Sequence, residues 1–424
     1  MEGEGGGAQA LDVRAVALAA KRAARALAIA TTAKKNAALL GMARLFRAEA
    51  AALVEANAAD LAAARETGLS SAMIDRLRLD EGRVESMARA VEDIARLPDP
   101  VGRIEGLEPR PNGLMVGKML VPIGLIGIVY ESRPNVTADA AALCLKSGNG
   151  CLLRGGKEAI HSNRAIAALI GRALAAEGLP KEGITLLAAT DREAIRTMAR
   201  LDGVLDLLIP RGGEALIRFV TENATVPVIQ HYKGVCHVYV DGDADLEMAE
   251  RIAVDAKVRR PSACNSLETL LVDAACAERF LPAVGAALRA HGVELRCDAA
   301  ALALLPDAKA ATDADWDAEY LDLVIAIRVV EGIDGALAHV AAHGSLHTEA
   351  IVTRSYERAQ RWIREVDASL VLVNASTRFN DGGELGLGAE MGISTTKLHA
   401  YGPMGLAELC AKKWVAYGDG QIRG

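Results

Sequence analysis

The residues of this chain best suited to covalent chemistry lie around Cys264, in the run Arg259-Arg260-Pro261-Ser262-Ala263-Cys264-Asn265-Ser266. A helical pattern ends at two arginines and a proline, small residues form a turn that carries the thiol, and an apolar strand follows. Nearby guanidinium groups favour the thiolate, and backbone amides in such a turn can hold an oxyanion. The run therefore indicates a nucleophile for an acyl carbon. The alternative is a small buried cysteine without chemistry, which is the commoner role.

Two glycine pairs with neighbouring cations stand where a strand is expected to pass into a helix. They are Arg154-Gly155-Gly156-Lys157 and Arg211-Gly212-Gly213. Glycine lets a ligand approach the backbone, and a helix N-terminus beside a cation favours phosphate. Both turns are therefore predicted to bind a dinucleotide coenzyme, and Arg154 and Lys157 could meet the 2′-phosphate that distinguishes NADP from NAD. The alternative is that the glycines serve only the geometry of their turns.

The elements around these turns alternate between strand and helix. Residues 11–96 are rich in alanine and amphipathic, which predicts helices broken near Thr31 and Thr67. Short apolar strands and helices then alternate through residues 123–230, and a second alternating series covers residues 235–374. This pattern predicts parallel sheets covered by helices, and 424 residues are too many for one core. We therefore expect an α/β fold with two lobes.

Composition excludes several classes of protein. The net charge of −7 argues against nucleic acid as the main partner, and no apolar run is long enough to cross a bilayer. Seven cysteines without a CxxC motif and the lack of a signal-peptide pattern favour the cytoplasm. His339, His343 and His347 have the spacing of metal ligands on a helix, but Gly344 is expected to end that helix. No metal site is predicted.

Six segments resemble γ-glutamyl phosphate reductases, a family within the aldehyde dehydrogenase superfamily. They are residues 121–137, 152–158, 208–213, 234–241, 260–265 and 373–383. The resemblance implies an aldehyde dehydrogenase-like α/β fold with a Rossmann-type NADP-binding domain, residues 1–107 and 121–234, and an α/β catalytic domain, residues 235–375. It also implies a small β arm of oligomerisation strands, residues 108–120 and 412–424. Residues 376–411 would form a substrate loop and return to the cofactor domain.

The resemblance also implies an activity, the NADPH-dependent reduction of L-glutamyl 5-phosphate to L-glutamate 5-semialdehyde and phosphate in proline biosynthesis. In the family the cysteine matching Cys264 forms a thioester with the substrate. The side-chain amide of Asn135 matches the one that joins the oxyanion hole, and Glu319 resembles the glutamate that positions the nicotinamide ribose. A turn residue is the alternative for Asn135, and a solvated surface residue is the alternative for Glu319.

The substrate carries an amino acid head and a phosphate, so cations are expected near the thiol. The candidates are Arg133, Lys146, Arg259, Arg260 and Arg378, each of which could equally form a salt bridge or a solvated surface. Aldehyde-oxidising relatives place a general-base glutamate in a stretch that corresponds here to residues 231–235, which contain no carboxylate. A reductase that uses an acyl phosphate has no need of a hydrolytic base.

Partners and alternatives follow from the same resemblance. The family pattern implies a homodimer or homotetramer, with the upstream glutamate kinase as a possible partner. A reductase of acyl-CoA thioesters is one alternative function. The other is a nucleotide-binding protein that kept the fold and lost catalysis, against which the presence of both Cys264 and Asn135 argues.

Overall fold

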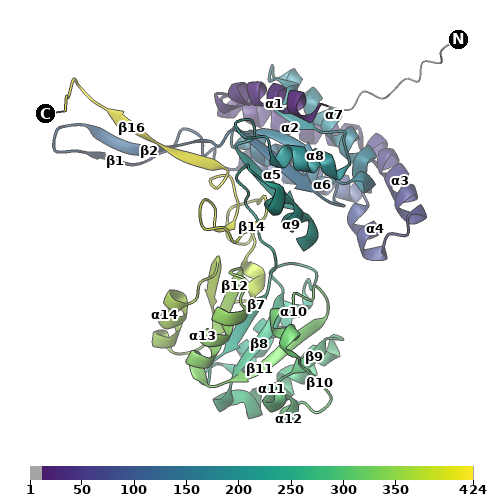
Figure 1. The fold of residues 1–424 in the computed structure, drawn as a ribbon, viewed down its shortest axis with the longest axis vertical. Helices are drawn as coiled ribbons and strands as arrows, with labels where there is room; N and C mark the ends of the chain where they lie inside the picture. The colour runs from purple at the N-terminus through teal and green to yellow at the C-terminus, as the bar shows by residue number, and fades with distance from the viewer. Residues whose placement is uncertain (1–11, 424) are drawn as a thin grey trace. The chain divides into compact units, whose positions relative to one another are not determined.

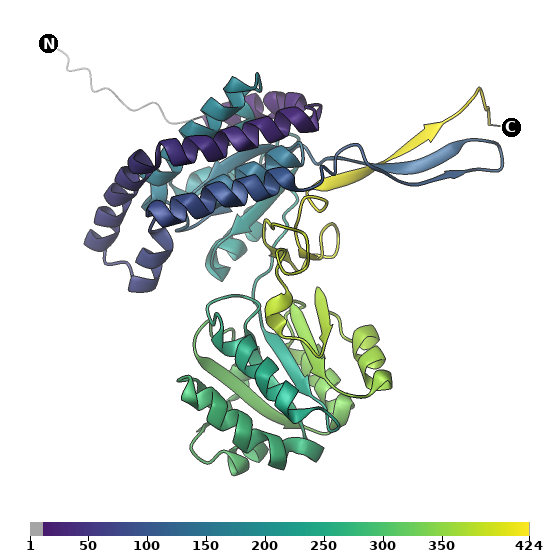
Figure 2. The same cartoon turned by 180° about the vertical axis from the view of Figure 1, so that it is seen from behind.

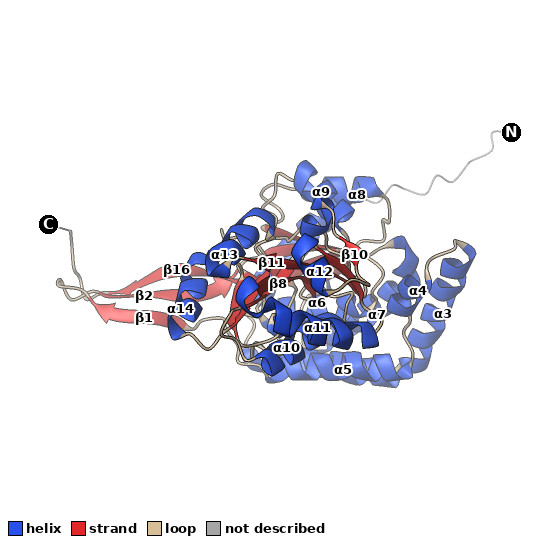
Figure 3. Ribbon diagram, turned by 90° about the horizontal axis from the view of Figure 1, so that it is seen from below, coloured by secondary structure: helices blue, strands red, loops and turns tan. Residues whose placement is uncertain are grey.

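The chain is described by a computed structural model that covers residues 12–423 (Figure 1). It divides into two compact units. The first comprises Met1–Ile229, Leu387–Met391 and Met404–Gly424, and the second comprises Gln230–Gly386 and Gly392–Pro403. Each unit contains its own parallel sheet. Strands and helices alternate through both (Figure 3), so the predicted α/β fold is confirmed.

The first unit begins with a block of helices, and side-chain caps explain where they start. The carboxylate of Asp12, the hydroxyl of Thr31 and the carboxylate of Asp80 each accept a hydrogen bond from an amide in the first turn of a helix. The helices are α1 (Val13–Ala28), α2 (Thr32–Ala48), α3 (Ala50–Glu66), α4 (Ser71–Leu77) and α5 (Glu81–Arg96).

A four-stranded parallel sheet forms the centre of the first unit, in the order β5-β4-β3-β6. Its strands are β3 (Leu125–Tyr130), β4 (Gly150–Arg154), β5 (Ile184–Leu186) and β6 (Leu207–Arg211), and the helices between and after them are α6 (Asn135–Lys146), α7 (Ile160–Ala176), α8 (Arg192–Ala199) and α9 (Glu214–Asn223). Apolar side chains of α1, α8 and α9 form one cluster with those of the sheet. Strands β3 and β4 are buried throughout, as expected for a parallel sheet covered on both faces.

The second unit contains a seven-stranded parallel sheet in the order β10-β9-β11-β8-β7-β12-β13. Its strands are β7 (Cys236–Val240), β8 (Leu267–Asp273), β9 (Glu294–Cys297), β10 (Lys309–Ala310), β11 (Val324–Val330), β12 (Thr348–Val352) and β13 (Leu370–Val373). The helices are α10 (Leu246–Val258), α11 (Ala274–Ala290), α12 (Ala299–Leu304), α13 (Gly332–His343) and α14 (Tyr356–Glu365), and β14 (Ile393–Ser394) pairs with β15 (Gly402–Pro403).

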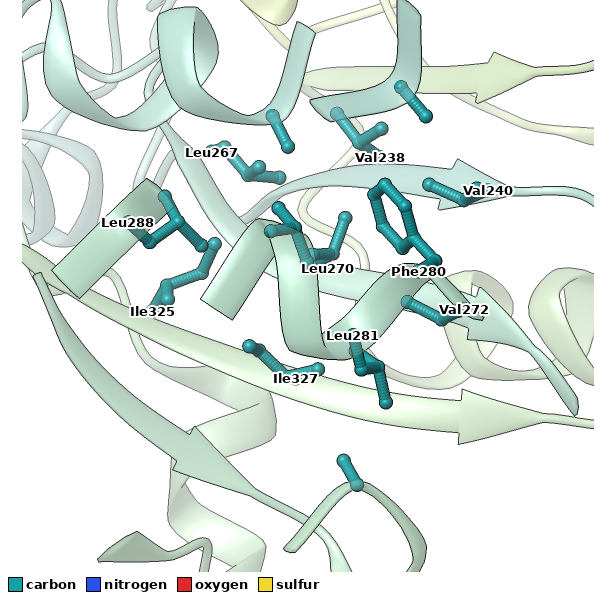
Figure 4. Close-up of a cluster of buried hydrophobic side chains, with 14 of the residues drawn as sticks. Val238, Val240, Leu267, Leu270, Val272, Phe280, Leu281, Leu288, Ile325 and Ile327 are labelled. Carbon is teal, nitrogen blue, oxygen red and sulfur yellow. The ribbon is translucent and has the colours of Figure 1, made fainter. Parts of the chain in front are cut away.

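Alternation along the central strands explains why helices cover both faces of this sheet. Val238, Leu270 and Val272 pack with α10 and α11 in one core cluster, where Phe280 lies among them (Figure 4). Their chain neighbours Tyr239 and Leu271 belong to a second cluster with α13 and α14. Successive side chains of a strand point to opposite faces, so a run of apolar residues needs cover on both.

A three-stranded antiparallel sheet is formed by β1 (Ile104–Pro109), β2 (Met115–Pro122) and β16 (Cys410–Tyr417), which lie side by side in both views (Figure 1 and Figure 2). Residues 108–120 were predicted as one strand-like piece, whereas the chain turns back between Arg110 and Leu114. Gly113 has φ 87° there, and the amide of Arg110 donates to the carbonyl of Leu114 at 2.7 Å. Glycine permits that conformation, so the segment forms a hairpin.

The boundaries of the two compact units differ from the predicted domain boundaries. The break falls between Ile229 and Gln230 rather than after residue 234. Gln230 accepts a hydrogen bond from the amide of Thr395, and His231 Nδ1 lies 2.9 Å from the carbonyl oxygen of Ile393, so both residues belong with the second unit. Residues 376–411 are shared between the units rather than forming one segment. No helix in residues 12–423 is long and apolar enough to cross a membrane.

Candidate active site

The turn that carries Cys264 connects α10 to β8 in the second unit. Residues 259–266, here called the nucleophile turn, follow the helix because Pro261 cannot continue it. The amide of Ala263 donates to the carbonyl of Arg260 at 3.1 Å, and the amide of Ser266 donates to that of Ala263 at 3.0 Å. Cys264 lies within the second of these tight turns and is half-buried. The thiol is therefore held by short-range backbone geometry and is not sealed in the core.

The start of β7 packs directly against the backbone of Cys264. A Cβ atom at Gly234 would lie 1.9 Å from the carbonyl oxygen of Cys264, so only glycine fits there. The thiol of Cys236 donates to the same oxygen at 3.2 Å. The nucleophile turn is thus positioned by the neighbouring strand as well as by its own turns.

A second loop, residues 376–380, holds the other side of the nucleophile turn. The hydroxyl of Thr377 donates to the backbone carbonyl of Asn265 at 2.7 Å, and the side-chain amide of Asn265 donates to the backbone carbonyl of Asn380 at 2.9 Å. These bonds fix the loop that carries Arg378. The sequence did not identify Asn265 or Asn380 as positioning residues, because their partners are distant in the chain.

Arg378 lies close to the thiol with part of its guanidinium unpaired. Its Nε and Nη1 atoms are buried and have no hydrogen-bond partner. Burial, followed by the positive charge of Arg260, lowers the pKa of Arg378, whereas Asp381 and Cys264 act in the opposite direction. Two of the five predicted substrate cations, Arg260 and Arg378, therefore lie near Cys264. Lys146, in contrast, is buried in the first unit and donates to Asn36 and to the carbonyl of Ala95, so it serves the fold there. Buried donors without a protein acceptor suit an anionic ligand.

Two histidines that were not predicted as site residues also lie at the thiol. A ring nitrogen of His231, a ring nitrogen of His347 and the sulfur of Cys264 are all within 4.8 Å of one another. Burial, followed by the positive charge that His231 can carry, lowers the pKa of His347 to about 3, so this ring is neutral at neutral pH. His231 lies in residues 231–235, the stretch in which aldehyde-oxidising relatives place a general-base glutamate. The missing glutamate was the sequence signal that pointed to this position.

Glu319 lies near a buried ion pair in the same unit. Lys257 Nζ is 2.8 Å from Glu268 Oε2, and both side chains are fully buried. Burial raises the pKa of Glu268 to about 7; Lys257 opposes this shift, and the charge of Glu319 adds to it. The predicted contact between Glu319 and a nicotinamide ribose stays a prediction.

Asn135 is the first residue of α6 in the first unit, and its side chain is exposed. Its amide donates to Asp139 Oδ2 at 2.9 Å, which fixes its direction. Burial raises the pKa of Asp139 to about 6, against the opposing effects of Asn135 and Arg211. The half-buried Arg133 lies just before it. The roles predicted for Asn135 and Arg133 stay predictions.

Contacts within the protein also explain why glycine occurs in these two pairs, in addition to the predicted binding of a coenzyme. A Cβ atom at Gly156 would lie 2.1 Å from Glu158 Oε1, and one at Gly212 would lie 2.4 Å from Glu131 Oε2. The same Glu158 oxygen accepts hydrogen bonds from the amide of Ser132 at 2.6 Å and from its hydroxyl at 2.8 Å. The glycines therefore make room for carboxylates that hold residues 131–135.

Features that fit a coenzyme phosphate are also present at these turns. Gly213 precedes α9 without a side-chain cap, and a Cβ atom there would meet nothing within 4 Å. Lys157 is exposed beside Gly155 and Gly156. Arg154, in contrast, is 6% exposed, and its guanidinium donates to the backbone carbonyls of Thr190 and Asp191. These groups fit an NADP phosphate, although Arg154 already serves the fold; their coenzyme contacts stay predictions.

The chain has two parallel α/β units. One carries a thiol on a tight turn, and the other carries glycine turns before helices. This combination defines the class of an aldehyde dehydrogenase. The model of the aldehyde dehydrogenase family matches residues 3–302. The γ-glutamyl phosphate reductase of Geobacter metallireducens is 55% identical over 411 residues, which are 97% of this chain and 98% of that protein. That of Salinibacter ruber is 57% identical over 415 residues, 98% of this chain and 95% of that protein.

A solved structure agrees with these relatives. The crystal structure of γ-glutamyl phosphate reductase from Thermotoga maritima is 44% identical, with a TM-score of 0.95 over 97% of this chain and 100% of that one. The chain belongs to the γ-glutamyl phosphate reductase family of aldehyde dehydrogenases. It is thus an oxidoreductase of the aldehyde dehydrogenase type, a family that uses nicotinamide coenzymes.

Proposed function

We propose that this chain reduces L-glutamyl 5-phosphate to L-glutamate 5-semialdehyde with NADPH. The γ-glutamyl phosphate reductases that it resembles support the substrate. In the proposed reaction the acyl phosphate, NADPH and one proton give the aldehyde, NADP⁺ and phosphate. This would be the second step of proline biosynthesis from glutamate.

The thiolate of Cys264 attacks the acyl carbon, a carbon–sulfur bond forms, and the bond to the phosphate oxygen breaks. NADPH, when bound, would supply the hydride that reduces the resulting thioester. The backbone amide of Cys264 and the side chain of Asn135 hold the oxyanion, whose collapse returns the sulfur as thiolate and releases the aldehyde. No carboxylate is present in residues 231–235 to activate water, so the thioester is kept for reduction.

The coenzyme would be held by the glycine turns of the first unit. Gly212 and Gly213 lead into the uncapped N-terminus of α9, which suits a phosphate. Lys157 and Arg211 supply positive charge, and Glu319 is proposed to bind the nicotinamide ribose. The exposed Lys157 is the better candidate for the 2′-phosphate of NADP than the buried Arg154.

The observation that carries the substrate proposal is the buried, unpaired part of the Arg378 guanidinium beside the thiol. A buried donor without an acceptor is unfavourable, and an anionic substrate would relieve this. Arg260 and Arg378 are placed to bind the phosphate or the amino acid carboxylate of the substrate. A neutral acyl chain would leave both cations unmatched.

The test is the reverse reaction, in which L-glutamate 5-semialdehyde, phosphate and NADP⁺ are supplied and NADPH formation is followed by absorbance. Wild type should turn over only when phosphate is present, and Cys264→Ala should be inactive. Replacing phosphate by coenzyme A tests the acyl-CoA alternative. Turnover with coenzyme A and none with phosphate would contradict the proposal, as would activity that survives Cys264→Ala.

We also propose that the sheet of β1, β2 and β16 joins subunits into a homodimer or homotetramer. Its outer strand β1 offers an unpaired edge in the described chain, and Trp414 on β16 is 67% exposed. Sedimentation should show an oligomer that Trp414→Asp weakens.

The kinase that makes the labile acyl phosphate is a further proposed partner, to be tested by co-sedimentation.

A further inference from the structure

The proposed reaction uses Cys264 but not the two histidines that cluster with it. Cys264, His231 and His347 each present a ligand atom, and these atoms lie within 4.8 Å of one another. A thiolate and two neutral imidazoles are ligands that zinc prefers, whereas magnesium and calcium prefer oxygen. The three residues come from three separate segments of the second unit, which its fold brings together.

Nδ1 of each histidine contacts a polar neighbour, which favours Nε2 as the ligand atom. His231 Nδ1 lies 2.9 Å from the carbonyl oxygen of Ile393, so Nδ1 carries the proton and Nε2 the lone pair. His347 Nδ1 is 2.7 Å from the hydroxyl of Thr348. Metal-bound histidines usually make such a second bond, which fixes both the tautomer and the direction of the ring.

His347 supplies the observation that points to a ligand. Its side chain is fully buried, and its Nε2 atom has no hydrogen-bond partner. A buried polar atom without a partner is unfavourable, and a bound cation would satisfy it.

We propose that Cys264, His231 and His347 bind Zn²⁺ reversibly, which takes the catalytic thiol out of use. The thiol proton passes to solvent as the sulfur–zinc bond forms, and water completes a four-coordinate site. Zinc lies about 2.3 Å from sulfur and about 2.0 Å from nitrogen, which puts tetrahedral ligands roughly 3.3–3.5 Å apart. The three side chains therefore close by about 1 Å on the ion.

The groups around the cluster favour reversible, inhibitory binding of zinc over permanent binding. Arg260 and Arg378 lie near the thiol, and their positive charge opposes a cation. Only three protein ligands are present, and the sulfur is also the group that the substrate must reach. Zinc and the acyl substrate therefore compete, and a chelator restores activity. The site goes beyond the proposed reaction, and binding can be observed without turnover.

The experiment adds Co²⁺ to metal-free enzyme and records the near-ultraviolet absorption of a thiolate bound to cobalt, together with visible bands of a four-coordinate ion. Zn²⁺ is then titrated to displace the cobalt and, separately, to inhibit the reverse reaction. Wild type should show the thiolate band, and Cys264→Ser should lack it. Because each lost ligand weakens binding, His347→Ala and His231→Ala should each reduce zinc affinity by about 10–100-fold.

His291→Ala is the matched control, since this histidine is exposed in the same unit at the end of α11, and its zinc affinity should stay at the wild-type value. The half-exposed His231 keeps the test valid if the buried His347→Ala fails to fold. A wild-type zinc affinity in His231→Ala overturns the proposal, because the thiol would then act alone or the metal would bind elsewhere. Absence of the cobalt–thiolate band in the wild type also overturns it.

Discussion

The nucleophile turn in the second unit and the glycine turns in the first unit both looked like ligand sites in the sequence, but their polar groups are used differently. In the glycine turns the carboxylates of Glu158 and Glu131 fill the space that the glycines leave, and they accept hydrogen bonds from the backbone. At the nucleophile turn, donor atoms of Arg378 and Nε2 of His347 are buried without partners. The glycine turns also leave Nε of Arg154 buried without a partner, but only at the nucleophile turn do such atoms lie beside a reactive thiol.

The difference teaches that a glycine pair beside a cation is weak evidence for a ligand until its neighbours are known. An unpaired buried atom is not sufficient either, because Trp362 Nε1 and His339 Nε2 are also unpaired, and neither residue is among the neighbours found at the thiol. The useful combination is an unpaired charged group beside a nucleophile whose position is fixed. Substitutions in the two regions should therefore have different effects.

Gly234→Ala should have the largest effect. Its Cβ would lie 1.9 Å from the carbonyl oxygen of Cys264, and because that atom is backbone, the nucleophile turn must move. A displacement of about 1 Å at the reacting atoms can lower kcat by about 100-fold. The reverse assay measures this loss. Gly171→Ala in α7 is the control, since a Cβ there would lie at an ordinary contact distance of 3.7 Å from Lys181; equal activity of the two variants would contradict the account of the turn.

Arg378→Ala should come next, through substrate affinity. A hydrogen bond to a charged group contributes about 1.5–3 kcal/mol, which corresponds to roughly a 10–100-fold increase in KM for phosphate or for the semialdehyde. Whichever KM rises identifies the group that Arg378 binds. Arg259→Ala removes a cation that is exposed and paired with Asp255, so its KM values should stay within about twofold of the wild type. Unchanged KM values in Arg378→Ala would remove the observation that carries the proposed substrate.

The sequence predicted the elements well because their signals are local. Alternating apolar runs gave the two parallel sheets, and Pro261 and Gly344 ended α10 and α13 near the expected places. Cys264 was predicted as a nucleophile from a short motif and from the family resemblance, and Arg260 and Arg378 were among the cations expected near it from the substrate that the resemblance implies. The fold class followed from the same patterns together with the family resemblance.

What the sequence could not give depends on distant contacts. His347 was considered with His339 and His343 as one helical pattern, whereas the helix ends at His343 and His347 stands at the start of β12. Its neighbour His231 comes from a remote segment. The glycines beside Glu158 were interpreted through an external phosphate, because no local pattern shows that a side chain two residues later folds back against them.

Glu158→Ala should have a moderate effect that belongs to the first unit alone. It removes the acceptor for the amide and hydroxyl of Ser132, whose φ of 47° is in the left-handed region. We expect the free energy of unfolding to fall by about 2 kcal/mol, as measured by urea denaturation. Glu158→Gln keeps an acceptor oxygen and should lose less. If the two variants are equally stable, the carboxylate does not hold residues 131–135.

His339→Leu should have the smallest effect, and it should alter stability rather than chemistry. Burial, followed by the charges of His237, His343 and Arg328, lowers the pKa of His339 to about 2. Between about pH 6.5 and pH 2 the unfolded chain therefore binds a proton that the folded chain excludes, so wild-type stability falls as the pH falls through this window.

His339→Leu removes this imidazole, so the free energy of unfolding should depend less steeply on pH, by up to about 1.4 kcal/mol per pH unit. The variant should therefore lose less unfolding free energy than the wild type between pH 7 and pH 5. Zinc inhibition and kcat should not change, because His339 packs against Trp316 and His237 rather than at the thiol. A change in zinc affinity would show that the helical pattern of histidines, and not the cluster at Cys264, binds the metal. The same variant therefore separates an unpaired group that serves the fold from one that awaits a ligand.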